Sequence, residues 1–222
     1  MTAAKKITAA SIRRGRREPL SRDRITTAAL TFIDRWGLEE LSTRRLGRQL
    51  GVEGMALYKH FKNRDEILDA VAEALILELE LPAEGKWFDR LKDFARRYRS
   101  LARVHPRAYP LLATRQLATP RALSLVEEVV KALLETGFSP DDAALVFRTV
   151  GNFCNGTALD ELAIMRRIAA EPLERGEKGS HLAALDRSMH PSHFDAQFEA
   201  GLSILVDGFE RMLAASRGKT KK

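Results

Sequence analysis

The segment LSTRRLGRQLGVEGMALYKHFKN, residues 41–63, constrains the fold of this chain more than any other part of it. It holds two short stretches with helical spacing of apolar residues, and Gly51 separates them. Ser42 is an N-cap candidate for the first helix, and the second is expected over about Val52–Phe61. A capped helix, a tight glycine turn and another short helix have the spacing of a helix-turn-helix.

Helical periodicity extends over the rest of the chain, and no stretch has the alternating pattern of a strand. Asn63 with Glu66 three residues later forms a capping-box pattern at the start of a strongly apolar helix. The sequence therefore predicts an all-α fold. The expected helices cover residues 21–36, 42–50, 52–61, 64–80, 87–104, 106–112, 120–136, 140–167 and 194–215.

Breaks in this pattern divide the chain. Residues 1–20 have no hydrophobic period and six Lys and Arg, which predicts a disordered basic arm. Residues 82–85 separate a unit at 21–81 from a larger helical unit at 82–216. The polar, glycine-containing stretch 171–191 is expected to be a loop or partly disordered, and 217–222 a solvated tail.

Positive charge is concentrated in the first third of the chain. Residues 1–64 contain 15 Lys and Arg and 6 Asp and Glu, a net charge of +9, whereas the whole chain carries +7. Such asymmetry favours a polyanionic partner for the N-terminal part. For residues 1–20 taken alone, a solubilising tail is an equal alternative. If the arm contacts DNA, we expect it to follow a minor groove.

Several other classes of protein have little support. No apolar run is long enough to cross a bilayer, and the basic start is not followed by the apolar stretch of a signal peptide. The single cysteine, Cys154, fits a reducing compartment, so a cytoplasmic location is expected. Because no metal-ligand pairs, phosphate-binding glycine loop or nucleophile motif occurs, we expect no enzyme, no metal site and no cofactor.

The helix-turn-helix segment carries side chains that are able to contact phosphates or base edges. A solvated helical face is the alternative, and it is favoured for Lys62 considered alone. For the set, within a net-positive region, DNA contact is the better interpretation. Its members are Thr43, Arg44, Tyr58, Lys59, His60, Lys62 and Arg64.

The tip of the expected second helix has no side-chain hydrogen-bond donor, because Gly54, Met55 and Ala56 occupy it. These residues would let the backbone approach the DNA closely and offer apolar contact to a thymine methyl group. Arg44 could read a guanine edge bidentately. Core packing is the alternative for Met55.

Residues from about Ser21 to Val71 resemble the DNA-binding domain of the tetracycline-repressor (TetR) family of transcriptional regulators. The resemblance is carried by the turn at 37–41, the block STRRLG, the GV joint at Gly51 and the ending LYKHFKNR. It implies a three-helix DNA-binding unit at 21–81, whose last helix connects to an effector-binding and dimerisation domain at 82–216. Tyr58 and Lys59, with His60 beside them, would then contact the phosphate backbone or the groove edge.

The second part of the chain is similar to the C-terminal domain of the tetracycline repressor, at residues 87–94, 113–115, 137–139 and 151–161. Two departures concern metal binding. Leu111 and Leu112 stand where a magnesium-binding histidine is expected, and Asn152 replaces another pocket histidine, although Asp160 and Glu161 remain. An effector other than magnesium–tetracycline is therefore expected.

The candidate effector contacts combine aromatic walls with a few polar groups. Plain core packing is as good an interpretation for each aromatic residue. Arg115 and Asn152 are the best candidates, because a polar group in an apolar interior needs a partner, and Arg115 suggests an acidic or carbonyl group. The full set is Phe94, Tyr98, Leu111, Leu112, Thr114, Arg115, Phe147 and Asn152.

The helices at 140–167 and 194–215 fit a four-helix interface between two copies of the chain. An apolar stripe along the last helix is expected there: Phe194, Phe198, Leu202 or Gly201, Leu205, Phe209 and Met212. A two-fold dimer predicts a palindromic operator. The family outcome is a repressor that a small molecule releases from DNA. An activator or co-repressor-dependent regulator stays open, and a helical adaptor that binds only protein leaves the charge asymmetry unexplained.

Overall fold

The computed structural model describes residues 19–80, 84–115, 119–170 and 190–219. Three predicted segments lie wholly or partly outside these residues. They are most of the basic arm (1–20), most of the polar loop (171–191) and half of the tail (217–222). Every regular element in the described ranges is helical, which confirms the all-α fold. No helix among them is long and apolar enough to cross a membrane.

The N-terminal unit begins with α1 (Arg22–Trp36) and α2 (Thr43–Leu50). Both start at predicted serine caps: the Ser21 hydroxyl accepts from the Arg24 N–H at 3.2 Å, and the Ser42 hydroxyl accepts from the next turn in the same way. A side-chain oxygen at this position satisfies one of the free N–H groups of a helix start, which fixes where each helix begins.

The element after the Gly51 turn is a six-residue 3₁₀ helix, η1 (Gly54–Lys59), and not the α-helix predicted over Val52–Phe61. Its hydrogen bonds span three residues, as between the Ala56 N–H and the Glu53 carbonyl at 2.9 Å. Glu53 enters it in an extended conformation and gives no side-chain cap. Without a capped first turn, the segment stays short and tightly wound.

Helix α3 (Arg64–Leu77) connects the two parts of the chain. It has the predicted capping box: the Asn63 side chain accepts from the Glu66 N–H at 2.8 Å, and the Glu66 carboxylate accepts from the Lys62 N–H at 2.6 Å. It ends three residues before the predicted Glu80, because hydrogen bonds spanning three residues tighten its last turn. Helix α3 packs against α1 on one side and against α5 and α6 on the other.

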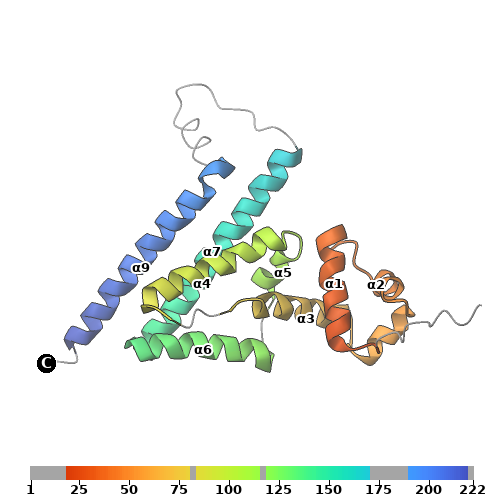
Figure 1. Cartoon of the computed structure of the whole chain (residues 1–222), viewed down its shortest axis with the longest axis horizontal. Helices are drawn as coiled ribbons and strands as arrows, with labels where there is room; N and C mark the ends of the chain where they lie inside the picture. Colours follow the sequence, from red (N-terminus) through yellow and green to blue (C-terminus); the bar gives the residue numbers. More distant parts are fainter. Residues whose placement is uncertain (1–18, 81–83, 116–118, 171–189, 220–222) are drawn as a thin grey trace, which may run out of the picture.

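The remaining helices form the larger part of the molecule, next to the N-terminal unit in Figure 1. Predicted and observed bounds agree for two of them, whereas α5 starts three residues later than predicted and α7 and α9 continue further. They are α4 (Trp87–Val104), α5 (Tyr109–Thr114), α6 (Pro120–Thr136), α7 (Pro140–Ala170), the short η2 (Pro191–His193) and α9 (Phe194–Lys219).

The apolar stripe of α9 does not face outward, which corrects the prediction that it forms the dimer interface. Phe194, Phe198, Leu202 and Phe209 are buried within the single chain, where α9 packs against α4 and α7. The Phe198 ring stacks on Phe153 of α7 with 5.2 Å between ring centroids. Periodicity identified the apolar face correctly but did not say which surface covers it.

A buried arginine ties α4, α7 and α9 together. Arg99 is 6% exposed, and its guanidinium donates to Glu161 of α7 at 2.6 Å and to Asp195 of α9 at 2.8 Å. It also lies over the Phe198 ring, 4.5 Å from the centroid. Two carboxylates compensate the buried charge, as a buried cation requires.

Candidate nucleic-acid interface and effector cavity

The corner between α2 and η1 depends on three glycines. Gly51 has the left-handed conformation, with φ of 71°, and ends α2. A Cβ on Gly47 would lie 2.8 Å from the Gly54 nitrogen, and one on Gly54 would lie 3.1 Å from the Thr43 carbonyl oxygen. The contact with α2 is therefore one reason why Gly54 has no side chain, and its approach to DNA stays a prediction.

The predicted contact residues on this corner are accessible to a partner. Arg44, Met55, Tyr58 and Lys59 are exposed, whereas Thr43, Ala56 and His60 are half-buried. Met55 is 74% exposed, which excludes core packing in this chain as its role. Exposed methionine costs free energy in water, so this side chain is suited to an apolar contact such as a thymine methyl group.

Arg64, a predicted DNA contact, has hydrogen-bond partners within the protein. Its Nε donates to the Leu41 carbonyl and its Nη2 to the Leu38 carbonyl, both at 3.1 Å. It therefore fastens the turn between α1 and α2 onto the start of α3. Arg48 was not predicted as a contact, yet it is exposed one helical turn after Arg44. The spacing of four residues between the two arginines places them on the same face of α2, and this could have indicated Arg48 as a candidate contact.

The C-terminal end of η1 is held by Arg22, the first residue of α1. Its guanidinium donates to the His60 carbonyl and to the Glu66 carboxylate, the latter at 2.9 Å, and lies over the Phe61 ring. The Lys62 N–H, with Arg22 alongside, holds the pKa of Glu66 below its usual range, despite the opposing effect of burial. The backbone at the end of η1 is thereby tied to α1 and, through Glu66, to α3.

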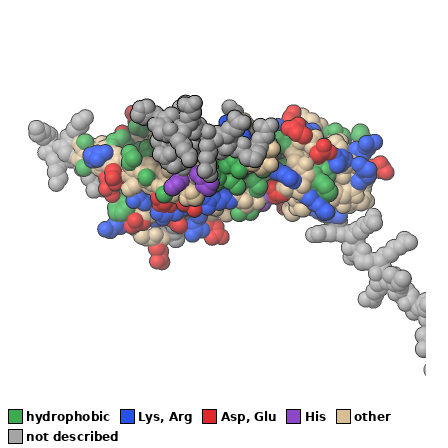
Figure 2. All heavy atoms as spheres, turned by 90° about the horizontal axis from the view of Figure 1, so that it is seen from above, with side chains coloured by type: hydrophobic (Ala, Val, Ile, Leu, Met, Phe, Trp, Pro, Cys, Tyr) green, Lys and Arg blue, Asp and Glu red, His purple; other side chains and the backbone are tan. Residues whose placement is uncertain are grey.

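The space-filling view shows Lys and Arg side chains interspersed with Asp and Glu side chains on the end that carries α1, α2 and η1, to the right in Figure 2. The basic side chains around a helix-turn-helix corner can neutralise phosphates, while the exposed tip reaches base edges.

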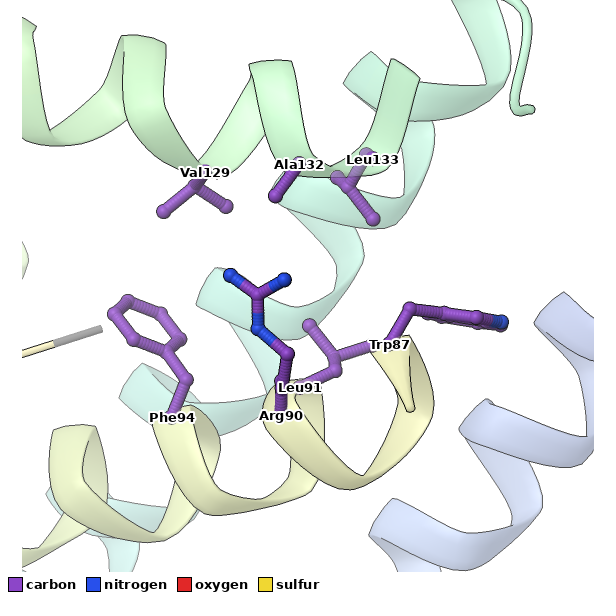
Figure 3. Close-up of a pocket in the computed structure, with 7 residues that line it drawn as sticks. All are labelled: Trp87, Arg90, Leu91, Phe94, Val129, Ala132 and Leu133. Carbon is purple, nitrogen blue, oxygen red and sulfur yellow. The ribbon is translucent and has the colours of Figure 1, made fainter. Parts of the chain in front are cut away.

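A cavity that opens to solvent lies between α4 and α6, and its empty volume of about 390 Å³ includes part of the open solvent. Figure 3 shows side chains of the two helices facing one another across it, with the Arg90 guanidinium directed between them. Apart from Arg90, every lining side chain is apolar or aromatic. The lining residues are Trp87, Arg90, Leu91, Phe94, Val129, Ala132 and Leu133.

Of the eight predicted effector contacts, Phe94 alone lines this cavity. Tyr98, Leu111 and Leu112 are buried in the core, and Phe147 is partly buried against it. Thr114 is exposed and donates its hydroxyl to the carbonyl of the residue four earlier at 2.7 Å.

Arg115 and Asn152 were predicted to be polar groups in the interior, and neither side chain lies there. Asn152 is exposed on α7, whereas Asn155, one turn later, accepts from the Tyr98 hydroxyl at 3.1 Å and the Tyr109 hydroxyl at 3.0 Å. Burial raises the pKa of Tyr98 to about 12, so the tyrosine hydroxyl remains a donor at neutral pH.

Arg115 lies at the end of α5, outside the cavity. Its guanidinium donates to Asp65 at 2.9 Å and also pairs with Asp69, both on α3. Two carboxylates within reach attract the guanidinium toward α3 and away from the interior. Arg115 therefore connects the effector part of the chain to the helix that carries the DNA-binding unit.

Two sequence families match this chain over adjoining parts. Residues 25–71 match "Bacterial regulatory proteins, tetR family", and residues 81–213 match "Tetracyclin repressor-like, C-terminal domain". The chain belongs to the TetR family. It is a ligand-responsive, DNA-binding transcriptional regulator with the helix-turn-helix at its N-terminal end.

The similarity of this TetR-family member to individual proteins covers most of each chain. It is 32% identical to an HTH-type transcriptional regulator of Saccharopolyspora erythraea, over 90% of this chain and 86% of that one. It is 31% identical to the class C tetracycline repressor protein of Escherichia coli, over 87% and 92%. A tetracycline-repressor variant from Acinetobacter baumannii AYE, solved with minocycline, superimposes with a TM-score of 0.72 at 28% identity, over 88% and 99%.

Proposed function

We propose that this TetR-family regulator is a repressor that binds a palindromic operator as a homodimer and is released by a small-molecule effector. One observation supports this most directly: α3 packs against α1 of the DNA-binding unit and also against α5 and α6 of the effector part. A movement of α5 or α6 would therefore displace the helix-turn-helix. The proposed activity is DNA binding and not catalysis. We propose that the protein acts in the cytoplasm, where it has access to DNA.

Operator recognition in this proposal is shared between charged and apolar groups. Four side chains contact phosphates or base edges in this proposal: the exposed Arg44 and Lys59 and the half-buried Thr43 and His60. Tyr58 contacts the DNA phosphate backbone. Met55 contacts the groove floor. We transfer the DNA role predicted for Arg64 to Arg48, because Arg64 is engaged by two carbonyls.

The proposed effector site is the cavity between α4 and α6. Its apolar walls and the Arg90 side chain suit a largely apolar molecule that also carries an acidic or carbonyl group. Arg115, the predicted anchor, pairs with Asp65 and Asp69 of α3 and does not line this cavity. Leu111 and Leu112 are buried in the apolar core and supply no metal ligand, so magnesium–tetracycline is not the proposed effector.

The proposed dimer uses the outward faces of α7 and α9, at 140–167 and 194–215. Leu145 of α7 is 53% exposed and Ile204 of α9 is 69% exposed, although both are large apolar side chains. Gly156 of α7 is also exposed, which would permit close approach of a second helix. Covering these faces with a second copy removes the apolar side chains from water.

Release follows from linkage between the two sites. An effector that binds better to the chain with displaced DNA-binding units must weaken operator affinity by the same factor. The ion pairs of Arg115 with Asp65 and Asp69 lie on the route from α5 to α3. We propose that these ion pairs rearrange when an effector binds between α4 and α6. This rearrangement would move α3 and, with it, the corner between α2 and η1.

Selection of genomic fragments on the immobilised protein tests the proposal. We expect a palindromic site, whose recovery falls when a largely apolar carboxylic acid is added. Random duplex DNA serves as the control for non-specific, salt-dependent binding. Failure to enrich any sequence would contradict operator binding. Stronger recovery on adding a compound would favour the co-repressor-dependent alternative, and activation of transcription from the recovered site would favour the activator.

A further inference from the structure

The loop between α4 and α5 contacts the C-terminal end of α1. Arg107, an exposed residue of this loop, donates from its Nη1 to the Asp34 carbonyl at 3.2 Å and also to the Arg35 carbonyl. His105, which directly follows α4, lies with its Nδ1 2.7 Å from the Asp34 carboxylate. The effector part of the chain thus contacts α1, and α1 packs against α2 of the DNA-binding corner.

The contact of Arg107 is made with the end of the helix itself. The last carbonyls of an α-helix have no partner within that helix and need donors from elsewhere. In α1 the Gly37 N–H satisfies the Ile33 carbonyl at 2.7 Å, and Arg107 supplies the donor for the next two carbonyls. A cation at this end also interacts favourably with the helix dipole. Because one nitrogen makes both contacts, the position suits any long cationic side chain with several N–H donors.

The loop that carries Arg107 is in turn held by α7. Arg166 of α7 donates from its Nη2 to the Pro106 carbonyl at 3.0 Å, and Pro106 directly precedes Arg107. Helix α7 also carries one of the outward faces of the proposed dimer. A continuous series of contacts therefore runs from this helix, through the loop, to the end of α1.

A second attachment joins the same two parts of the chain. Arg115 pairs with Asp65 and Asp69, which lie on α3. One attachment alone leaves the DNA-binding unit free to turn about that point, whereas attachments on both α1 and α3 fix its orientation. The loop with Arg107 supplies the attachment on α1, so it bears on how the corner between α2 and η1 is presented.

We propose that Arg107, held in place by Arg166, is a positioning residue: it fixes the orientation of each DNA-binding unit on α7 and thereby the spacing of operator half-sites that the dimer accepts. We call the contacts of Arg107 with the two α1 carbonyls and of Arg166 with the Pro106 carbonyl the Arg107 brace. The proposal rests on the proposed function, because half-site spacing has a meaning only for a dimer on a palindromic operator.

The expected effect follows from the geometry of duplex DNA. One added base pair between the half-sites turns one of them relative to the other by about a tenth of a turn. Units that are held in one orientation match one spacing and bind poorly to the next. Units without the brace have to be ordered on binding, which costs affinity at the native spacing, but they adapt to an altered spacing at a lower cost. Loss of Arg107 therefore weakens binding and broadens the accepted spacing.

Operator titration with a series of duplexes tests the proposal. The probes are the operator duplex recovered by genomic selection and versions with one base pair added or removed at its centre. Arg107→Gln removes the cation, and Arg107→Lys keeps a cationic donor. Arg97→Gln is the matched control, because Arg97 is an exposed arginine of α4 that pairs with Asp93 of its own helix. All proteins are full-length.

We expect Arg107→Gln to bind the native spacing about ten-fold more weakly, from a loss of about three-fold in each unit of the dimer. The penalty for an added or removed base pair should shrink by about three-fold or more. The slope of log affinity against log salt concentration should stay unchanged, because Arg107 contacts protein and not a phosphate. Arg107→Lys should restore both affinity and spacing preference, and Arg97→Gln should behave as the wild type.

Three results would overturn the positioning role of Arg107. The first is a spacing profile of Arg107→Gln that parallels the wild type. The second is a lower salt slope, which would make Arg107 a direct phosphate contact. The third is an Arg107→Lys variant that binds as weakly as Arg107→Gln, since the position would then not depend on a cationic donor.

A double-mutant cycle tests the part of Arg166. Because Arg166 acts through the loop and Arg107, Arg166→Gln should have the same effects at a smaller size. The combination Arg107→Gln/Arg166→Gln should then be no weaker than Arg107→Gln alone. Additive losses would show that Arg166 acts independently and would contradict the series of contacts from α7 to α1.

Hydrogen exchange without DNA separates the brace from operator binding. We expect amides in the last turn of α1, including that of Gly37, to exchange several-fold faster in Arg107→Gln than in the wild type, with the start of α1 unchanged. Equal exchange in the two proteins contradicts the brace. Faster exchange in a protein that enriches no operator leaves the brace intact but contradicts the proposed function and, with it, the spacing role.

Discussion

Gly47 of α2 and Gly54 of η1 are in direct backbone contact: a Cβ placed on Gly47 would lie 2.8 Å from the Gly54 nitrogen and 2.9 Å from its Cα. Real Cβ atoms do not approach backbone so closely, so this pair sets the angle between the two helices of the motif. The positions of the exposed residues Met55, Tyr58 and Lys59 therefore depend on that contact.

Gly47→Ala is therefore expected to disrupt DNA binding. Since the opposing atoms are backbone and not a flexible side-chain end, η1 has to shift, at a cost of about 1–3 kcal/mol in the free energy of unfolding. Thermal unfolding and operator titration measure the two effects. Gly151→Ala on α7 is the stability control, because no described residue outside its own helical turn lies within 4 Å of the new Cβ. Equal stability of the two variants would contradict the packing argument.

Arg115→Gln is expected to weaken the response to effector without weakening effector binding. The substitution removes the ion pairs with Asp65 and Asp69 of α3 but touches none of the cavity residues. Effector affinity by calorimetry should change less than two-fold, whereas the shift in operator affinity on adding effector should shrink several-fold. Arg121→Gln, at an exposed arginine of α6, is the matched control. An unchanged response in Arg115→Gln would contradict the coupling role.

The starts of α1, α2 and α3 could be predicted from the sequence because the information is local. Serine caps at residues 21 and 42 and the Asn63–Glu66 capping box lie within a few residues of the helices that they begin. Periodicity likewise identified which face of each helix is apolar.

Long-range pairing could not be predicted in this way. Asn152 and Asn155 are both asparagines of α7, and the sequence does not distinguish them as pocket residues. Of the two, Asn155 lies beside the hydroxyls of Tyr98 and Tyr109. Arg115 was expected to need a partner in the apolar interior, and its pairing with Asp69 and Asp65 could not be predicted because they are 46 and 50 residues away in the sequence. The stripe of α9 was assigned to a second copy, although α4 and α7 of the same chain cover it.

Glu161→Gln is expected to destabilise the fold by about 3 kcal/mol. Arg99 is buried, and loss of the Glu161 charge leaves it with Asp195 alone, whose side chain is 70% exposed. Chemical denaturation measures the change, and Glu127→Gln on the exposed surface of α6 is the control, with a change within about 0.5 kcal/mol. If Glu161→Gln behaves like the control, the ion group does not hold the three helices together.

Cys154 is expected to resist alkylation in the native protein. Burial raises the pKa of its thiol to about 12, and the group also donates a weak hydrogen bond to the Ala95 carbonyl. At pH 8 almost none of it is the reactive thiolate, and reagent access is closed. Mass spectrometry after iodoacetamide treatment should show one label only when denaturant is present. Rapid labelling without denaturant would contradict the buried position.

The most direct test of the DNA-reading corner compares the salt dependence of operator binding in the wild type and in Arg44→Ala/Lys59→Ala. Each phosphate contact adds about one to the slope of log affinity against log salt concentration. Because the proposed dimer carries each substitution twice, the double variant should bind more weakly and show a slope lower by about four if both side chains contact phosphates, or by about two if Arg44 reads a base. An affinity and slope equal to those of the wild type would show that this corner does not face DNA.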